Sequence, residues 1–283
     1  MCVDPCAYGA RAQVGVGRRL GTLGLQGRMR PQNLVARVAL PNPAARSLRT
    51  HPALMEQSPF TSLVTLADNP EPRCPCVLVL DTSASMDGEP IEALNRGVQL
   101  LLDELAADGL ASKRVELALV SFGGSVQIAA DFSAPGTFNP PHFAAAGATP
   151  MGEAVVRALE MLEARKEDYR RAGLQYYRPW IFLITDGEPT DLASRLWEKA
   201  VRLVHEGEAG RRLLFFGVAV RDANRERLNA LCPPGRPSVR LEGLRFAELF
   251  RWLSSSLKGV SCSQPGTERL RLPSPDAWLS IDV

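Results

Sequence analysis

The sequence predicts one large α/β domain built on a mostly parallel, doubly wound sheet of six strands, with one antiparallel edge strand and helices on both faces. Two observations predict this architecture. Short apolar runs, typical of strands buried on both faces, alternate with helix-like patterns from residue 74 to residue 258. In addition, two strand-like segments are separated only by Gly123-Gly124, which is typical of an antiparallel hairpin.

Each element follows from a local pattern. The first apolar run, residues 77–80, stops at Asp81, and Pro90 then stands near the first position of an amphipathic helix. A second apolar run, residues 180–185, stops at Asp186. The other expected strands are residues 115–122, 125–132, 213–220 and 238–241. The other expected helices follow Pro150 or span residues 191–205, 224–231 and 246–257.

The two ends of the chain show no such periodicity. Residues 1–55 contain eight arginines, no lysine and a single acidic residue. Because they offer too little apolar surface to offset the entropy of ordering, residues 1–70 are expected to be disordered or a non-native extension, and residues 259–283 a flexible tail. Two interpretations of the arginines stay open: a basic arm for nucleic acid or lipid, or untranslated sequence before a start at Met55. The lack of aromatic residues other than Tyr8 favours the second.

Composition argues against several classes of protein. The formal net charge is +2, which gives no reason to expect a nucleic-acid or membrane partner. No secretory signal is recognised at the start, and no stretch approaches the ~18 consecutive apolar residues of a membrane span. The six cysteines are therefore expected to be reduced thiols in the cytoplasm. The Cys74-Pro75-Cys76 pair is expected to pack against the first strand, with a metal or redox role as the less favoured alternative.

Two buried strands that each end in an aspartate predict a cation site. In a doubly wound sheet, ligands bind at the carboxyl ends of the strands, so Asp81 and Asp186 are expected at the same edge. Two carboxylates there repel each other unless a cation or hydrogen-bond donors compensate. The segment Asp81-Thr82-Ser83-Ala84-Ser85 directs two hydroxyls to the same region. These hard oxygen donors suit Mg²⁺ or Mn²⁺, and no histidine or cysteine suited to zinc accompanies them.

This arrangement resembles the metal-ion-dependent adhesion site (MIDAS) of von Willebrand factor A-type (vWA) domains. The resemblance covers about residues 74–258 and implies the Rossmann-like vWA fold. Its motifs are Asp-x-Ser-x-Ser after the first strand, a threonine in the loop of residues 147–150, and Asp-Gly after a later strand. The metal-site residues that it implies are Asp81, Ser83, Ser85, Thr149 and Asp186. By the same resemblance the serines coordinate the metal directly, the threonine joins them when a ligand is bound, and the aspartates act largely through water.

A finer resemblance concerns the residues around the two aspartates. Residues 80–95 and residues 183–191 (LITDGEPTD) are similar to the bacterial TerY-like vWA proteins, which are associated with tellurium-resistance and stress-response gene clusters. One departure is Ala84, where many relatives have glycine. Since a Cβ disfavours a positive φ, the loop has to be one that an L-residue adopts. We expect the metal site to tolerate this alanine.

Motifs of catalysis are missing from the sequence. It contains no P-loop and no G-x-S-x-G elbow, and its three histidines are scattered without a nucleophile motif. A haloacid-dehalogenase-type phosphotransferase needs a second aspartate two residues after the first, and Ser83 stands there. We therefore expect a non-enzymatic, metal-dependent protein-interaction module that binds an Asp or Glu carboxylate of another protein. A bacterial stress-response or tellurium-resistance-type system is the expected setting. A substrate-recruiting adaptor subunit for an ATPase and, less favoured, a metal-dependent phosphatase or hydrolase stay open.

Two further acidic residues, Glu188 and Asp191, follow the second aspartate closely. They could tune the metal, contact a partner, or be solvated acids of a loop. The sequence alone does not choose among these roles.

Deletion of the residues before Met55 tests the interpretation of the amino-terminal segment. If that segment contributes almost nothing to the core, its removal should leave the melting temperature nearly unchanged. Differential scanning calorimetry of the full and shortened chains measures this. A fall of more than about 5 °C, which corresponds to over a kcal/mol for a domain of this size, would mean that the segment packs on the rest.

Overall fold

The computed structural model describes residue 66, residues 68–221 and 223–266, residue 273 and residues 279–280. All of them belong to one unit of the chain, Met55–Val283. The expectations for the arginine-rich start concern residues outside this description, as do those for most of the tail after residue 266. Leu66, the first described residue, is buried, and its carbonyl oxygen accepts a hydrogen bond from Arg73 (3.4 Å).

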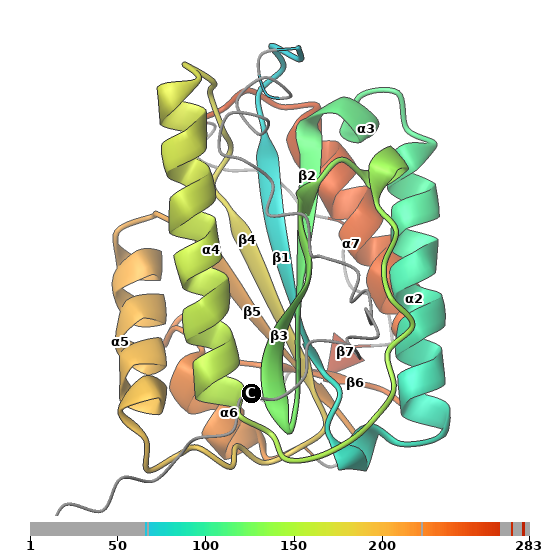
Figure 1. Ribbon diagram of the computed structural model, residues 1–283, viewed down its shortest axis with the longest axis vertical. Helices are drawn as coiled ribbons and strands as arrows, with labels where there is room; N and C mark the ends of the chain where they lie inside the picture. The colour runs from blue at the N-terminus through green and yellow to red at the C-terminus, as the bar shows by residue number, and fades with distance from the viewer. Residues whose placement is uncertain (1–65, 67, 222, 267–272, 274–278, 281–283) are drawn as a thin grey trace, which may run out of the picture. The chain divides into compact units, whose positions relative to one another are not determined.

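A mostly parallel sheet forms the centre of this unit (Figure 1). Its strands lie in the order β3-β2-β1-β4-β5-β6-β7. They are β1 (Cys74–Asp81), β2 (Val115–Gly123), β3 (Ser125–Ser133), β4 (Trp180–Thr185), β5 (Leu214–Val220), β6 (Val239–Leu241) and β7 (Leu279–Ser280). The six predicted strands are all present, and β3 is the predicted antiparallel edge strand, paired with β2. The two-residue β7, which the sequence did not indicate, adds a second antiparallel edge beside β6.

The strand order reverses at β1. From β1 the chain passes to β2 and β3 on one side, and later to β4, β5 and β6 on the other. Both neighbours of β1 run parallel to it. The carboxyl ends of β1 and β4 therefore flank the switch point of the sheet, where doubly wound folds bind ligands.

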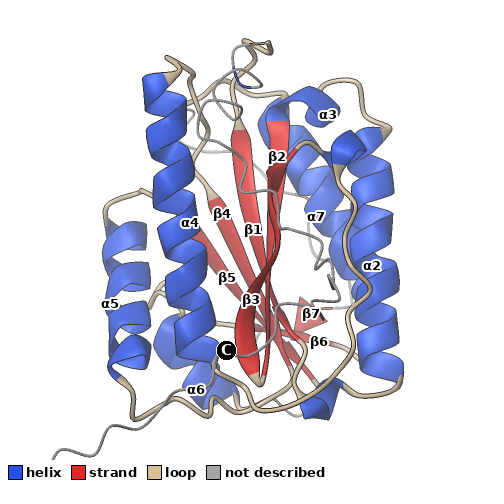
Figure 2. Ribbon diagram, viewed as in Figure 1, coloured by secondary structure: helices blue, strands red, loops and turns tan. Residues whose placement is uncertain are grey.

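Helices cover both faces of the sheet (Figure 2). α2 (Glu89–Ala106) and α7 (Phe246–Ser261) pack on one face, and α4 (Met151–Arg171) and α5 (Arg195–Ala209) pack on the other. The shorter helical segments are α3 (Ala111–Arg114), α6 (Arg225–Leu231), and the 3-10 turns η1 (Ala84–Met86) and η2 (Pro135–Thr137). Among the helices that the structure describes, none has both the length and the apolar character that a membrane crossing requires.

One helix begins later than its sequence pattern indicates. The pattern predicts a helix from Asp191, whereas α5 begins at Arg195. The reason is a capping residue: the Ser194 hydroxyl accepts a hydrogen bond from the backbone N–H of Trp197 (3.1 Å) and so fixes the first turn. Asp191 stays outside the helix, and its carboxylate contacts a different element.

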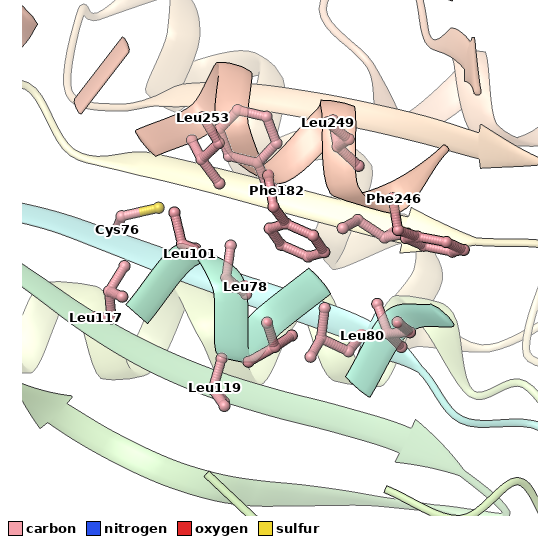
Figure 3. Close-up of a cluster of buried hydrophobic side chains, with 14 of the residues drawn as sticks. Cys76, Leu78, Leu80, Leu101, Leu117, Leu119, Phe182, Phe246, Leu249 and Leu253 are labelled. Atoms are coloured by element: carbon pink, nitrogen blue, oxygen red, sulfur yellow. The ribbon is translucent and has the colours of Figure 1, made fainter. Parts of the chain in front are cut away.

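Burial on both faces holds β1 in place. Leu78 and Leu80 point to the side of α2 and α7, whereas Val77 and Val79 point to the side of α4 and α5. Figure 3 shows the first of these clusters, in which the labelled β1, β2 and β4 side chains meet Leu101, Phe246, Leu249 and Leu253 of the helices. Each fully buried leucine contributes about 2 kcal/mol relative to an exposed one. A strand packed in this way presents its terminal residue at a defined position.

We predict opposite effects for two glycine-to-alanine changes in the helix pair α2 and α7. A Cβ on Gly97 of α2 would lie 2.4 Å from Phe250 Cδ2, so the helices would have to separate. Gly97→Ala should therefore destabilise the domain by about 1–3 kcal/mol, despite alanine's higher helix propensity. At Gly259 of α7, no atom lies within 4 Å of the added Cβ, so Gly259→Ala should be neutral or stabilise by up to about 1 kcal/mol. Denaturant unfolding compares the two, and equal effects would contradict the close packing.

Candidate metal site at the carboxyl edge of the sheet

Asp81 is the last residue of the central strand and is fully buried. The carboxyl end of β1 lies at the switch point, at the end of the sheet where α4 begins (the lower end in Figure 1). The Oδ1 of Asp81 accepts a hydrogen bond from the backbone N–H of Ser83 (2.8 Å). Its Oδ2 accepts one from the Thr185 hydroxyl (2.5 Å). The two carboxylate oxygens are thus oriented by the loop after β1 and by the end of β4.

A chain of hydroxyls connects the loop after β1 to the loop after β4. The Ser83 and Ser85 hydroxyl oxygens lie 3.0 Å apart. Ser85 donates in turn to Asp186 Oδ1 (2.6 Å). Ala84, between the two serines, begins η1. Its φ is negative: among the described non-glycine residues, only Arg211 and Arg221 have a positive φ. The prediction that an L-residue fits this loop is confirmed.

The loop that carries Thr149 is attached to the first loop through backbone hydrogen bonds. Ala84 N donates to Gly147 O (3.0 Å), and Ala146 N donates to Thr82 O (2.8 Å). Gly147 has a φ of +76° and a Cβ there would lie 2.5 Å from Gly124 Cα, so only glycine allows this approach. Thr149 is consequently brought to the same edge as the two serines.

Gly187 marks the point on which three of the oxygens converge. A Cβ built on it would lie 3.2 Å from Thr149 Oγ1, 3.4 Å from Asp81 Oδ2 and 3.5 Å from Ser85 Oγ. One small volume is therefore bordered by oxygens of the segment after β1 and of the Thr149 loop, and the absence of a side chain at residue 187, in the loop after β4, leaves it open. The structure brings together all five residues that the sequence indicated: Asp81, Ser83, Ser85, Thr149 and Asp186.

Burial makes the negative charge at this edge costly. The pKa of Asp81 is raised above its ordinary value, first because burial removes the carboxylate from water, and to a smaller extent because Asp186 is nearby. The hydrogen bonds from Ser83 and Thr185 act in the opposite direction. In the described part of the chain no lysine or arginine pairs with either aspartate. A cation would supply the missing positive charge.

The donor set is chemically uniform. It contains two carboxylates and three hydroxyls, and no group of three or more His, Cys, Asp or Glu side chains suited to a metal occurs among the residues described. Oxygen donors alone suit Mg²⁺ or Mn²⁺. The Cys74-Pro75-Cys76 pair lies in buried β1, where burial raises the pKa of Cys74 to about 12. A protonated thiol inside the core supports the expectation that these cysteines serve packing.

Sequence reasoning did not identify Thr185 as part of the site. Its hydroxyl donates to Asp81 and accepts a hydrogen bond from Gly187 N (3.2 Å), so it links the two aspartate loops. The available signal was a polar residue at the end of an otherwise apolar strand. That signal is weak, because many strands end in threonine for reasons of β propensity.

Comparison with known proteins identifies the family of the domain. The model of the von Willebrand factor type A domain matches residues 76–247, more than half of the chain. The chain belongs to the vWA family. Domains of this family bind a divalent metal at a MIDAS and often mediate metal-dependent protein interactions. No match is found among the curated proteins.

Several solved structures resemble the vWA domain of this chain. The open conformation of the pilus adhesin SpaC from Lactobacillus rhamnosus GG has a TM-score of 0.51 and 14% identity, covering 68% of this chain and 31% of that one. The ArnB paralog VWA2 from Sulfolobus acidocaldarius has a TM-score of 0.44 and 15% identity, covering 65% of this chain and 45% of that one. Proximal thread matrix protein 1 from the mussel byssus, with a zinc-occupied MIDAS motif, has a TM-score of 0.44 and 13% identity, covering 67% of this chain and 48% of that one. The chain spans about half the length of the first structures that it matches. The likeness to SpaC supports the fold.

We predict that Asp81→Asn abolishes the stabilisation of the domain by divalent metal without lowering the stability of the metal-free domain. Without divalent metal the variant should melt no lower than the wild type, because the change removes a buried charge and keeps the side-chain shape. With Mg²⁺ or Mn²⁺ the wild type should melt higher than before, since a ligand that binds only the folded state stabilises it, and the variant should not. Scanning fluorimetry in chelator and in metal measures both. Equal metal-induced shifts would remove Asp81 from the site.

Proposed function

We propose that this vWA domain is a metal-dependent protein-binding module whose MIDAS takes a carboxylate from a partner protein. The observation that carries the proposal is the convergence of three oxygens, from Asp81, Ser85 and Thr149, on the volume next to Gly187, with Asp186 hydrogen-bonded to Ser85 at its border. Ser83, Ser85 and Thr149 would hold Mg²⁺ or Mn²⁺ directly, with Asp81 and Asp186 acting mainly through water. Bound there, the ion offers an electrophilic position to an incoming Asp or Glu side chain.

The charge of the donor set supports binding rather than storage of the metal. Three of the five donors are neutral hydroxyls, so an ion held by them retains much of its positive charge toward an open position. A carboxylate from another protein is a charge-assisted ligand for such a position. Thr149 is buried, and no hydrogen bond to another described residue occupies its hydroxyl. That hydroxyl is available to a metal when a partner arrives.

Hydrolysis is the less supported alternative. Both oxygens of Asp81 accept hydrogen bonds, from Ser83 and Thr185, and Ser83 stands where a haloacid-dehalogenase-type enzyme needs its second aspartate. No histidine of the described chain touches the site: His142 lies beside Glu92 (3.7 Å) and His205 beside the Cys232 carbonyl (3.0 Å). These contacts support a holding role for the aspartate and a non-enzymatic protein.

The similarity of residues 80–95 and 183–191 to TerY-like proteins supports a bacterial, cytoplasmic role in a stress-response or tellurium-resistance-type system. An adaptor subunit that recruits substrates to an ATPase would use the same carboxylate-binding site. We place the partner among proteins with an exposed Asp or Glu, and not among nucleic acids or membranes, because the net charge is only +2.

Thr149→Ala tests the binding proposal, and Thr137→Ala is its matched control. Thr137 is the exposed last residue of η2, and its hydroxyl donates to the Ala134 carbonyl oxygen (3.0 Å). In an affinity capture with Mg²⁺ or with chelator, the wild type and Thr137→Ala should retain the same chelator-sensitive partner, and Thr149→Ala should lose it. Both variants should fold normally, since neither threonine belongs to the apolar clusters of the core.

A second assay distinguishes binding from hydrolysis. Turnover of a generic phosphoester by the wild type with Mg²⁺ should be indistinguishable from buffer. Robust metal-dependent turnover that disappears in Asp81→Asn would overturn the proposed function while leaving the fold assignment intact. Partner capture that survives both chelator and Thr149→Ala would show that binding occurs elsewhere on the domain.

A further inference from the structure

The first turn of α4 is capped by a residue that is distant in sequence. The residue before the helix, Pro150, provides no side-chain cap. Instead the carboxylate of Asp191 accepts hydrogen bonds from two successive backbone N–H groups of α4, from Gly152 to Oδ1 (3.2 Å) and from Glu153 to Oδ2 (3.0 Å). These are among the N–H groups that a helix leaves without internal partners, and the helix dipole favours a negative charge beside them.

The same loop makes a second connection, directly to the metal-site threonine. Thr190 N donates to the Thr149 carbonyl oxygen (3.0 Å). The loop that begins with Asp186 is therefore attached to the loop of Thr149 by the backbone of Thr190 and by the side chain of Asp191. Two metal-site donors on different loops, Thr149 and Asp186, are held at a fixed separation by this attachment.

The backbone around this attachment is closely packed. A Cβ on Gly152 would lie 2.7 Å from Trp197 Cα and 2.9 Å from Asp191 Oδ2. Glycine is thus what lets the start of α4 approach both the start of α5 and the capping carboxylate. The other acid of the loop, Glu188, is different: it is exposed and lies near Asn224 Nδ2 (3.4 Å) and Arg227 Nε (3.8 Å), away from α4.

We propose that Asp191 is a positioning residue of the metal site, which sets the spacing between Thr149 and Asp186 by capping α4 from the loop after β4. The proposal rests on the metal-binding function proposed above. Asp191 does not ligate the ion, because both of its oxygens are directed to backbone N–H groups of α4. Glu188, its neighbour in sequence, carries no such role.

The test compares Asp191→Ala and Asp191→Asn with two matched controls. Asp108→Ala removes the same kind of cap elsewhere, because Asp108 Oδ1 accepts from the successive N–H groups of Leu110 (3.0 Å) and Ala111 (2.8 Å) at the start of α3. Glu188→Gln removes one negative charge from the same loop without touching α4. Mn²⁺ affinity is measured by paramagnetic resonance on the full chain, and unfolding free energy by denaturant.

Asp191→Ala should weaken Mn²⁺ binding by about tenfold, as expected when a group that orients ligands is lost. Asp191→Asn, which keeps one acceptor oxygen, should lose less, and it preserves the test if the alanine variant does not fold. Asp108→Ala should lower stability by a similar amount but leave Mn²⁺ affinity unchanged, and Glu188→Gln should also leave it nearly unchanged. Amide hydrogen exchange at Gly152 and Glu153 should be faster in both Asp191 variants even without metal.

The outcomes separate this proposal from the proposed function. If the wild type binds Mn²⁺ and Asp191→Ala binds it equally well, or if Glu188→Gln weakens binding as much, the positioning role is overturned and the metal site stands. If the wild type binds no Mn²⁺, the proposed function is overturned. In that case the exchange rates at Gly152 and Glu153 alone decide whether Asp191 holds the two loops together, and unchanged rates would overturn that as well.

Discussion

A fully buried carboxylate beside a second carboxylate is the constraint on which the rest of the site depends. Asp81 ends the central strand at the switch point of the sheet, and Asp186 follows the adjacent strand. Burial and like charge both disfavour ionisation there, as the raised pKa of Asp81 expresses. Ser83, Ser85 and Thr185 donate hydrogen bonds to the two carboxylates, and the hydroxyl of Thr149 faces the same volume. The edge is therefore arranged as a cation site, and the vWA family uses such an edge to bind a divalent metal.

The precision of this edge comes from the framework beneath it. Because β1 is packed against helices on both faces, the position at which it ends is fixed by the core. The loops are then attached to one another through backbone hydrogen bonds, such as Ala84 N to Gly147 O and Thr190 N to Thr149 O. Backbone contacts of this kind depend on glycine where chains approach closely, as at Gly147 and Gly152. Side chains that touch a metal need such support to keep their geometry.

Much of the fold and of the site could be predicted from local patterns, and each exception has a physical cause. The six strands and the main helices followed from periodicity and from glycine and proline, and the five metal-site residues followed from a motif in three parts. The start of α5 was predicted too early because an aspartate can cap either the helix that follows it or a helix distant in sequence. Asp191 caps α4, and Ser194 caps α5. Thr185 was missed because its role is a contact with Asp81, far away in the chain. The pairing of β7 with β6 depends on only two residues, which is too short a segment to leave a pattern.

The sequence by itself determined the fold class, the edge of the sheet that carries the chemistry, and the hard-oxygen character of its donors. These follow from residue type and spacing, which can be interpreted without knowing which residues are in contact. Only the tertiary structure decided that oxygens of Asp81, Ser85 and Thr149 converge next to Gly187. It also decided that Asp81 has both of its oxygens engaged, and that Asp191 and Glu188 have different surroundings. Each of these is a contact between residues distant in the chain. Such contacts are set by how the strands and helices pack, and the local sequence does not encode them.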